Sequence, residues 1–313
     1  MHITLMFNSV LPVSKYGGIQ RDVIWLTKEF IRMGHSVAVI ARPGSYAEGA
    51  EMIFANSKAE AFTKVPKHTD IVNVHDGPPP ADFAFPCLIS AHGNGFVPDD
   101  RNWSFVSANH AKRFGRETFV YNGVPKDETY YSSDKSDRFL FFSRINREGK
   151  NISKAMDIAL KHDLELDIAG GSRRDLLMRS VVRRERAFFK SLAPNFTFHG
   201  LVGGWEKAAL FAHAKALLFP IRWEEPFGLV VIESLLAGTP VITTGYGAMP
   251  ELMDPEVGFI CENDADYDAA IAQVDTISPA RCREYAAEHF SMEQSANGYL
   301  ALYERILNGE KLR

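Results

Sequence analysis

The chain has 313 residues, of which 46% are hydrophobic and 24% are charged. That length suits two domains, and the composition excludes a disordered chain, a collagen-like chain and a small disulfide-stapled scaffold. The net charge of −4 gives no indication of a nucleic-acid partner. The three cysteines, Cys87, Cys261 and Cys282, show no Cys-x-x-Cys spacing, which favours buried thiols in a reducing compartment over disulfides or zinc ligands.

Membrane and export signals are not evident in the sequence. No stretch reaches the roughly 18 uncharged apolar residues that a membrane-spanning helix needs. The first residues do not combine a basic region with a small-residue cleavage site. We therefore expect a cytoplasmic protein, and the composition leaves its oligomeric state open.

Short apolar runs alternate with segments of helical period in the first 120 residues. The predicted strands cover residues 3–7, 37–41, 71–75 and 88–91. After the first strand, Ile19, Val23, Leu26 and Phe30 recur at helical spacing, and Gly34 is placed to end that helix. Strands that are apolar throughout are typical of a parallel sheet covered by helices on both faces, so the pattern indicates a doubly wound α/β domain.

A polar stretch over residues 122–136 interrupts this alternation, and we place the domain boundary there, between domains 1–133 and 134–313. Strands are then predicted at residues 139–143, 164–169, 196–199 and 216–219, with helices from about residues 152, 174 and 205. A last helix, over residues 291–307, needs a partner surface, which we expect on the N-terminal domain. In such domains, ligands bind at the carboxyl ends of the strands.

The most informative segment runs over residues 220–243. Glu225 and Glu233 are eight residues apart, and Pro226, Phe227 and Gly228 precede an apolar helix predicted over residues 229–236. The first turn of such a helix offers backbone N–H groups to an anion. Carboxylates accept hydrogen bonds from sugar or ribose hydroxyls. The alternative is that one glutamate caps the helix and the other packs against it.

Taken whole, this segment resembles the E-x7-E region of the family 4 retaining glycosyltransferases, which have the GT-B fold. Ala-Gly-Thr-Pro-Val-Ile at residues 237–242 and Met-Pro-Glu-Leu at residues 249–252 extend the likeness. The resemblance covers nearly the whole chain. It implies an α/β protein of two Rossmann-like doubly wound domains facing across a cleft, an N-terminal acceptor domain and a C-terminal nucleotide-sugar donor domain.

Three N-terminal motifs carry the resemblance further. Tyr-Gly-Gly-Ile-Gln-Arg at residues 16–21 is similar to a family glycine loop that lies against the donor phosphates and the acceptor, which implies this role for Gly17 and Gly18. The alternative is an ordinary turn. Ser-Ala-His-Gly at residues 90–93 resembles the family's strand-end histidine and implies that His92 contacts the donor sugar near the reacting carbon; His75 competes, but we interpret it as structural. Asn-Gly-Val at residues 122–124 matches the family hinge, where we expect a turn with positive φ at Gly123.

Residues 141–150 resemble the family segment that holds the donor diphosphate. The likeness implies that Arg144 and Lys150 neutralise charge on the leaving group. Ser143 replaces the usual glycine, and Gly149-Lys150 reverses the usual Lys-Gly order, so Arg147 is an alternative second cation. A solvated basic loop is the other interpretation.

The resemblance thus implies a complete site. The residues expected to act on the reacting groups are His92, Glu225, Arg144 and Lys150. The residues expected to bind the donor are Gly17, Gly18, Gly200, Pro226, Phe227, Gly228, Leu229, Val230 and Glu233. No metal is expected, because Asp264-Ala-Asp266, formally the Asp-x-Asp of metal-dependent glycosyltransferases, sits in a polar turn outside the predicted site.

We therefore expect a retaining, metal-independent and cofactor-free transfer of a hexose from a nucleotide-diphosphate sugar. A UDP-sugar is favoured and a GDP-sugar is the alternative, and the acceptor is a hydroxyl of a glycan, a lipid-linked sugar or a small molecule. The competing functions are a hydrolysing epimerase of the same fold and a non-catalytic sugar-nucleotide-binding subunit. A dehydrogenase is disfavoured, because Gly-x-Gly-x-x-Gly is missing. The basic segment 173–190 could contact anionic lipid at the inner membrane face, or form a solvated helix face.

Overall fold

A computed structural model describes residues 1–13, 15, 17–96, 98–177 and 186–312 of the chain. The chain divides into two compact units, which we call unit 1 (Met1–Pro125 with Phe290–Arg313) and unit 2 (Lys126–His289). The division lies before Lys126 rather than after residue 133. The residues in between belong to unit 2, since the Tyr131 ring lies against Gly238 and the Ser132 amide donates to the Ala237 carbonyl.

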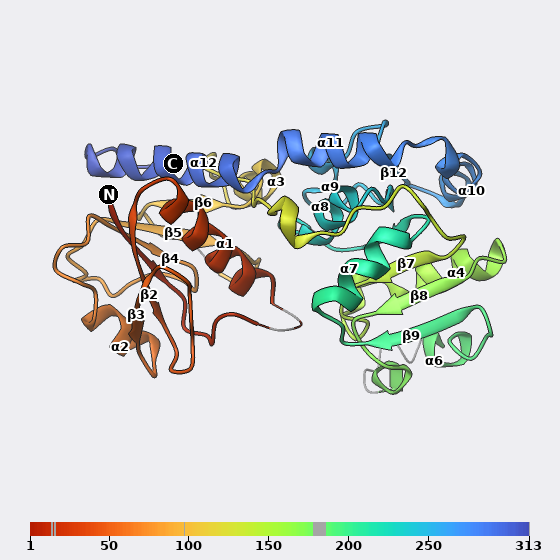
Figure 1. Cartoon of the computed structure of the whole chain (residues 1–313), viewed down its shortest axis with the longest axis horizontal. Coiled ribbons are helices and arrows are strands. Elements are labelled where there is room, and N and C mark those ends of the chain that lie inside the picture. The colour runs from red at the N-terminus through yellow and green to blue at the C-terminus, as the bar shows by residue number, and fades with distance from the viewer. Residues whose placement is uncertain (14, 16, 97, 178–185, 313) are drawn as a thin grey trace. The chain divides into compact units, whose positions relative to one another are not determined.

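Unit 1 contains a six-stranded parallel sheet in the order β3-β2-β1-β4-β5-β6 (Figure 1). The strands are β1 (His2–Met6), β2 (Ser36–Ala41), β3 (Glu51–Phe54), β4 (Ile71–Val74), β5 (Cys87–Ala91) and β6 (Trp103–Phe105). The helices are α1 (Gly18–Arg32), α2 (Lys58–Thr63), α3 (Ala108–Arg113) and α12 (Met292–Leu307). The strand order reverses between β1 and β4, so the carboxyl ends of these two strands form the position where doubly wound folds bind ligands.

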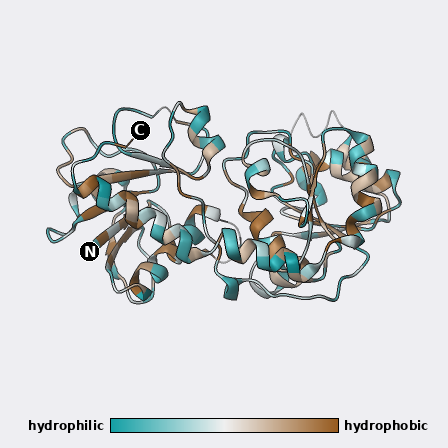
Figure 2. Ribbon diagram, turned by 90° about the horizontal axis from the view of Figure 1, so that it is seen from above, coloured by the Kyte–Doolittle hydropathy of each residue, from teal (hydrophilic) through white to brown (hydrophobic). Residues whose placement is uncertain are grey.

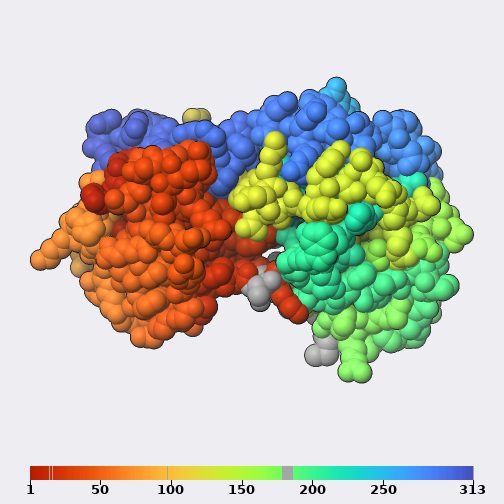
Figure 3. Space-filling model, viewed as in Figure 1, coloured from red at the N-terminus to blue at the C-terminus, as the bar shows by residue number. Residues whose placement is uncertain are grey.

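Helix α12 joins the C-terminal residues to unit 1. It begins with a capping box between Ser291 and Gln294, which satisfies backbone N–H groups of its first turn. Tyr299 and Tyr303 are fully buried on it, and α12 contacts α1 and β5. In the space-filling view, its surface lies directly over the N-terminal residues of unit 1 (Figure 3). The apolar face that the sequence left without a partner is therefore part of the unit 1 core.

Unit 2 repeats this topology with the order β12-β11-β10-β7-β8-β9, again all parallel. The strands are β7 (Phe139–Phe142), β8 (Leu166–Ala169), β9 (Phe196–Gly200), β10 (Leu217–Phe219), β11 (Val241–Thr243) and β12 (Gly258–Ile260). The helices are α4 (Ile152–Lys161), α6 (Ala187–Lys190), α7 (Gly204–His213), α8 (Leu229–Leu236), α9 (Met249–Leu252), α10 (Asp264–Gln273) and α11 (Pro279–His289), with short 3₁₀ turns η1 (Lys126–Glu128), η2 (Glu148–Lys150), η3 (Arg173–Leu177) and η4 (Val274–Thr276). Here the order reverses between β7 and β10.

Hydrophobic residues lie along the strands of each unit and on parts of its helices (Figure 2). Every residue of β4, β10 and β11 is buried, as expected of parallel strands inside a helical coat. The predicted α/β fold of two doubly wound sheets is confirmed. Among the helices that the described residues form, none combines the length and the hydropathy that crossing a bilayer requires.

Two local predictions were wrong. The predicted strands omitted β3, whose half-exposed Glu-Met-Ile-Phe sequence lacks the continuous apolar run of an inner strand. Gly123 does not adopt a positive φ. A glycine stands there because a side chain would come within 2.6 Å of the backbone of Met292, where the Val124 amide donates to the Phe290 carbonyl.

Candidate functional site

The predicted site residues of unit 2 lie on the loops that follow β7 and β10. These strands are neighbours at the reversal of strand order, so their loops meet at the carboxyl edge of the sheet. The loop after β7 carries Arg144 and Lys150, and the loop after β10 carries Glu225. The Arg222 amide donates to the Gly149 carbonyl over 2.9 Å, which ties one loop to the other.

Glu225 and Lys150 form an ion pair at this edge. Nζ of Lys150 contacts Oε2 of Glu225, and Nε1 of Trp223 donates to the same oxygen over 2.8 Å. The Lys150 ammonium also lies 5.2 Å from the ring centre of Trp223 and 5.2 Å from that of Phe219, where an aromatic face attracts a cation. Both members of the pair are mostly buried. These contacts leave Oε1 of Glu225 as the oxygen outside the ion pair.

The unusual Gly149-Lys150 order has a steric cause. A side chain at Gly149 would come within 2.7 Å of Cβ of Trp223, so only glycine lets the loop lie against the tryptophan. Lys150 follows directly and reaches Glu225, whereas Arg147 is exposed. The geometry therefore brings Lys150, and not Arg147, to the predicted carboxylate.

The segment Gly-Tyr-Gly-Ala at residues 245–248 supports Glu225 from the other side. The Ala248 amide donates to the Glu225 carbonyl over 2.9 Å, and the Gly247 amide donates to Oε2 of Glu224 over 3.0 Å. A Cβ at Gly247, which has φ of 61°, would lie 2.3 Å from the Glu225 backbone. Glycine there holds the glutamate loop in place by close backbone approach.

Helix α8 begins directly after this loop, with Gly228 as its N-cap at φ of 109°. A side chain at Gly228 would collide with Cε of Met249 at 2.6 Å. In the described part of the chain no side chain caps this helix, whose first turn holds Leu229 and Val230. Such a turn presents N–H groups and the positive end of the helix dipole, which suits an anionic ligand.

Glu233 lies further along α8 and is only 4% exposed. Its Oε1 pairs with Nζ of Lys207 from α7, and Lys207 lies 5.8 Å and 5.9 Å from the ring centres of Phe142 and Phe211. A buried carboxylate is costly unless a cation compensates it, and Lys207 supplies that cation for Glu233. Sequence reasoning missed Lys207 and Trp223. The usable signals were a lysine in the otherwise apolar part of α7 and a tryptophan two residues before Glu225.

The loop that carries Arg144 rests on two glycines after β8. A Cβ at Gly170, which has φ of 115°, would lie 1.9 Å from the Ser143 carbonyl oxygen. The amides of Gly170 and Gly171 donate to the Gly200 carbonyl over 2.8 and 3.2 Å. Gly200 therefore supports this loop through its carbonyl.

In unit 1, His92 follows β5 and meets His75, which follows β4. Nδ1 of His75 and Nε2 of His92 are 2.8 Å apart, so the two predicted competitors form one hydrogen-bonded pair. Burial lowers the pKa of His92 to about 3, with repulsion from His110 adding to it, and burial lowers the pKa of His75 well below its ordinary value. Both rings are therefore neutral at pH 7.

Asp22 of α1 lies beside this pair, and no sequence motif pointed to it. One oxygen of its carboxyl group and one ring nitrogen of each histidine all lie within 4.8 Å of one another. Asp22 is 1% exposed, and burial raises its pKa to about 7, although the charge of Arg21 opposes the shift. Gly17 ends the loop after β1 as the N-cap of α1, with φ of 150°, and Gly18 is the first residue of the helix that carries Asp22.

Asp264 and Asp266 belong to the first turn of α10. Asp266 forms a capping box with Asn263, and Asp264 pairs with Lys154. The Asp-x-Asp sequence is thus explained by helix capping. Within segment 173–190, Arg173 donates to the carbonyls of Ser191 and Phe196. Lys190 contacts Ser153 and Asp157, and residues 178–185 lie outside the described residues.

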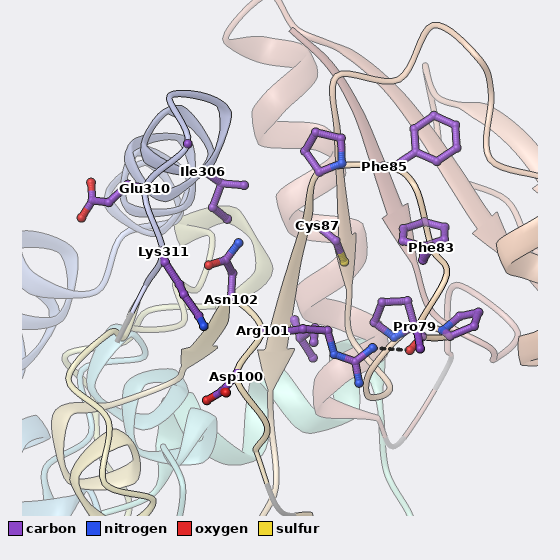
Figure 4. A pocket seen from close by; sticks show the side chains of 15 residues that line it. Pro79, Phe83, Phe85, Cys87, Asp100, Arg101, Asn102, Ile306, Glu310 and Lys311 are labelled. Atoms are coloured by element: carbon purple, nitrogen blue, oxygen red, sulfur yellow. Dashed lines mark hydrogen bonds between the residues drawn. The ribbon is translucent and has the colours of Figure 1, made fainter.

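Unit 1 also has a cavity of about 530 Å³ at the opposite edge of its sheet (Figure 4). Its walls come from the amino ends of β5 and β6 and from the end of α12, including Phe83, Cys87, Arg101 and Lys311. Arg101 donates to the Pro79 carbonyl across it. The cavity lies away from His92, at the carboxyl end of β5, so we do not include it in the site.

Known proteins resemble this chain in sequence and in fold. Residues 136–277 match the model of the family described as "Glycosyl transferases group 1". An uncharacterized 41.2 kDa protein of the cps region of Klebsiella pneumoniae is 30% identical over 124 residues, which is 37% of this chain and 34% of that protein. The alignments span about a third of the length of the first curated relatives.

Two solved structures share the fold. AviGT4, a glycosyltransferase involved in avilamycin A biosynthesis, superposes with a TM-score of 0.85 at 23% identity, covering 100% of this chain and 99% of that one. Anabaena HepE, in complex with UDP and glucose, superposes with a TM-score of 0.66 at 14% identity and 99% coverage of both chains. The likeness extends over both sheets, as the GT-B fold predicts.

Proposed function

We propose that the chain transfers a sugar from a nucleotide-diphosphate sugar to a hydroxyl group of an acceptor, because residues 136–277 match the glycosyl transferases group 1 model and the whole chain shares the fold of a glycosyltransferase. The observation that carries this proposal is the arrangement in unit 2. The loops after β7 and β10 carry the Lys150–Glu225 pair, and the N-terminus of α8 follows the second loop. The buried Glu233 lies further along α8. This arrangement suits a ligand with a negative centre flanked by hydroxyl groups.

The diphosphate would lie against Arg144, Lys150 and the first turn of α8. When the bond between sugar and phosphate breaks, negative charge grows on the departing phosphate, and fixed cations and N–H groups stabilise it. Lys150 has three donors and uses one on Glu225, so it can keep that contact while binding phosphate. These groups would replace a metal ion, and we propose a metal-independent reaction.

The two glutamates would bind the two ends of the donor. Glu225 would accept hydrogen bonds from sugar hydroxyls through Oε1, since Oε2 is engaged by Lys150 and Trp223. The backbone from Pro226 to Gly228 would line the same sugar. Glu233 would accept from the ribose diol, with Lys207 compensating its charge.

His92 would contact the sugar near the reacting carbon, and Gly17 and Gly18 would lie close to the phosphates. The resemblance to family 4 supports net retention at the anomeric carbon, with the departing phosphate oxygen taking the proton of the acceptor hydroxyl. UDP is the favoured nucleotide, supported by the UDP and glucose bound to HepE. A hexose donor and a glycan, lipid-linked or small-molecule acceptor complete the proposal.

Titration calorimetry tests donor binding. The full chain is titrated with UDP, GDP and ADP and with their glucose and mannose conjugates, and we expect one nucleotide to bind with a micromolar dissociation constant. Glu233→Ala should weaken that binding at least tenfold, because hydrogen bonds to a charged group contribute about 1.5–3 kcal/mol. The matched control is Glu284→Ala, which removes an exposed glutamate of α11. Equal affinity of both variants would reject the assigned site.

A further inference from the structure

The loop that begins with His92 has a sequence that does not fix its own conformation. It reads His-Gly-Asn-Gly-Phe at residues 92–96 and follows directly on β5. Neither Gly93 nor Gly95 has a positive φ, and a Cβ at either would meet no heavy atom of the described residues within 4 Å. Glycine has the widest choice of backbone conformations, so contacts from other parts of unit 1 are needed to hold this loop in one of them.

Helix α3 supplies two of these contacts. Nε2 of His110 donates to the Gly93 carbonyl over 3.0 Å, which fixes the peptide group between Gly93 and Asn94. Nη1 of Arg113 donates to Oδ1 of Asn94 over 3.0 Å, one residue further along the loop. The two donor residues are three positions apart on α3, so they lie on the same face of the helix and bind neighbouring residues of the loop.

The third contact is aromatic and lies at the end of the loop. The Phe96 ring stacks on Trp103 and on Phe114, with ring centres 5.2 and 4.6 Å apart and ring planes that differ by 5° and 15°. Stacked rings at such distances attract each other beyond the burial of their surface. The loop is therefore anchored in its middle by α3 and at its end by the stacked rings.

The α3 side chain that holds the loop backbone is itself fixed in place. The Ser107 side chain caps α3 by accepting from the His110 amide over 3.0 Å. The His110 side chain is fully buried, and Phe105 and Phe114 meet its ring edge-on, with ring centres 5.1 and 5.5 Å away. Burial lowers the pKa of His110 to about 4, so the ring is neutral at pH 7, and its carbonyl partner places the hydrogen on Nε2.

We propose that His110 and Arg113 are positioning residues, which hold the loop after β5 so that His92 meets the substrates in one fixed arrangement. The role of His92 in this proposal rests on the proposed function, whereas the anchoring of the loop does not. His75 holds the ring of His92 through Nε2, and α3 holds the backbone that follows. A displacement of about 1 Å in a reacting group can lower a rate about 10²-fold, so loss of an anchor should affect turnover more than binding.

A purely structural role of these two side chains is the alternative. If they only stabilise unit 1, their variants should lower the melting temperature and leave the kcat of the folded enzyme unchanged. The nucleotide is proposed to bind unit 2, to which neither α3 nor the loop belongs. Nucleotide affinity should therefore stay the same under both interpretations, and kcat distinguishes them.

Steady-state release of nucleoside diphosphate from a nucleotide sugar by the full chain tests the proposal. His110→Phe keeps a buried ring and removes the donor, and Arg113→Met keeps an apolar stem and removes the guanidinium. Each should lower kcat about 10–100-fold, while the Kd for the nucleoside diphosphate stays within twofold. His110→Gln, whose amide can donate to the Gly93 carbonyl, should stay within threefold of the wild-type kcat, and Lys112→Met, an exposed control on α3, should match the wild type. A kcat within twofold of the wild type in both His110→Phe and Arg113→Met would overturn the proposal.

The anchoring of the loop is measured independently of activity by NMR relaxation. In the deuterated full-length protein labelled with ¹⁵N-glycine, the order parameters of Gly93 and Gly95 are recorded, with each signal assigned through its alanine variant. We expect about 0.85 for both in the wild type, the value of rigid backbone, and below about 0.6 in the double variant His110→Phe with Arg113→Met. Values that stay near 0.85 in the double variant would overturn the proposal. Absence of turnover in the wild type would refute the proposed function and leave these order parameters as the test of the anchoring.

Discussion

Replacing Lys207 with methionine tests whether the Glu233 carboxylate depends on its buried partner. The substitution keeps the length and apolar stem of the side chain and removes the charge, and Glu233 is 4% exposed. Breaking a buried ion pair typically costs 3–5 kcal/mol. Because the Lys207 side chain is 15% exposed and water screens it in part, we expect the free energy of unfolding to fall by about 2–4 kcal/mol.

The companion variants complete a double-mutant cycle. Glu233→Gln alone should cost about 1–2 kcal/mol, since the flexible lysine can turn toward solvent. The double variant, Lys207→Met with Glu233→Gln, should recover at least half of the loss caused by Lys207→Met, because no buried charge remains to be compensated.

Urea denaturation followed by tryptophan fluorescence measures these changes, and the melting temperature of Lys207→Met should fall by about 5–15 °C. Nucleotide affinity provides a second readout: Lys207→Met should stay within threefold of the wild type, and Glu233→Gln should be weaker. Additive losses in the cycle, or a cost below about 0.5 kcal/mol for Lys207→Met, would refute the argument that Lys207 compensates a buried carboxylate.

Four further outcomes are expected. Gly170→Ala should destabilise unit 2 by more than about 2 kcal/mol and lower kcat, because its Cβ would collide with the loop that bears Arg144. The control is Gly204→Ala, at a positive φ with open space around it, which should cost about 1 kcal/mol. Equal losses of unfolding free energy in urea denaturation would contradict the steric account. Arg144→Ala should lower kcat about 10²–10³-fold, and an unchanged kcat in steady-state kinetics would remove this residue from the proposed mechanism. Activity should persist in EDTA, and a loss restored by magnesium would argue for a metal-dependent reaction. Finally, burial lowers the pKa of His92 to about 3, so the unfolded state binds a proton at higher pH than the folded state does. His92 should therefore lower the free energy of unfolding as pH falls from about 6.5 toward 3. His92→Asn should make that free energy less dependent on pH, and an unchanged dependence would contradict the neutrality of His92.

The strongest sequence signals were local ones. Helix α8 was expected over residues 229–236 and spans Leu229–Leu236, since a run that is apolar except for Glu233 and Ser234 lies between Gly228 and Gly238 and marks both ends of a buried helix. The inner strands were visible for the same reason. Strand β3 was not, because an edge strand that begins with exposed Glu51 lacks the apolar run that marks an inner strand.

Contacts between residues that are distant in the chain could not be predicted from the sequence. Nothing local shows that Lys207 of α7 meets Glu233 of α8, because the packing of the two helices creates that contact. His75 and His92 were weighed as rivals, yet neighbouring parallel strands carry them to one hydrogen bond. Motifs indicated which loops bear the candidate residues, and tertiary packing decided which of these residues are paired, compensated or buried.

Release of nucleoside diphosphate from a nucleotide sugar tests the central claim most directly. The wild type is incubated with UDP-, GDP- and ADP-sugars, with and without candidate acceptor alcohols, and free nucleoside diphosphate is quantified. We predict release from one nucleotide class, accelerated by an acceptor and lowered at least a hundredfold in Lys150→Met, because the cation beside Glu225 stabilises the leaving group. Release at the wild-type rate in Lys150→Met, or no release and no binding with any nucleotide sugar, would contradict the account.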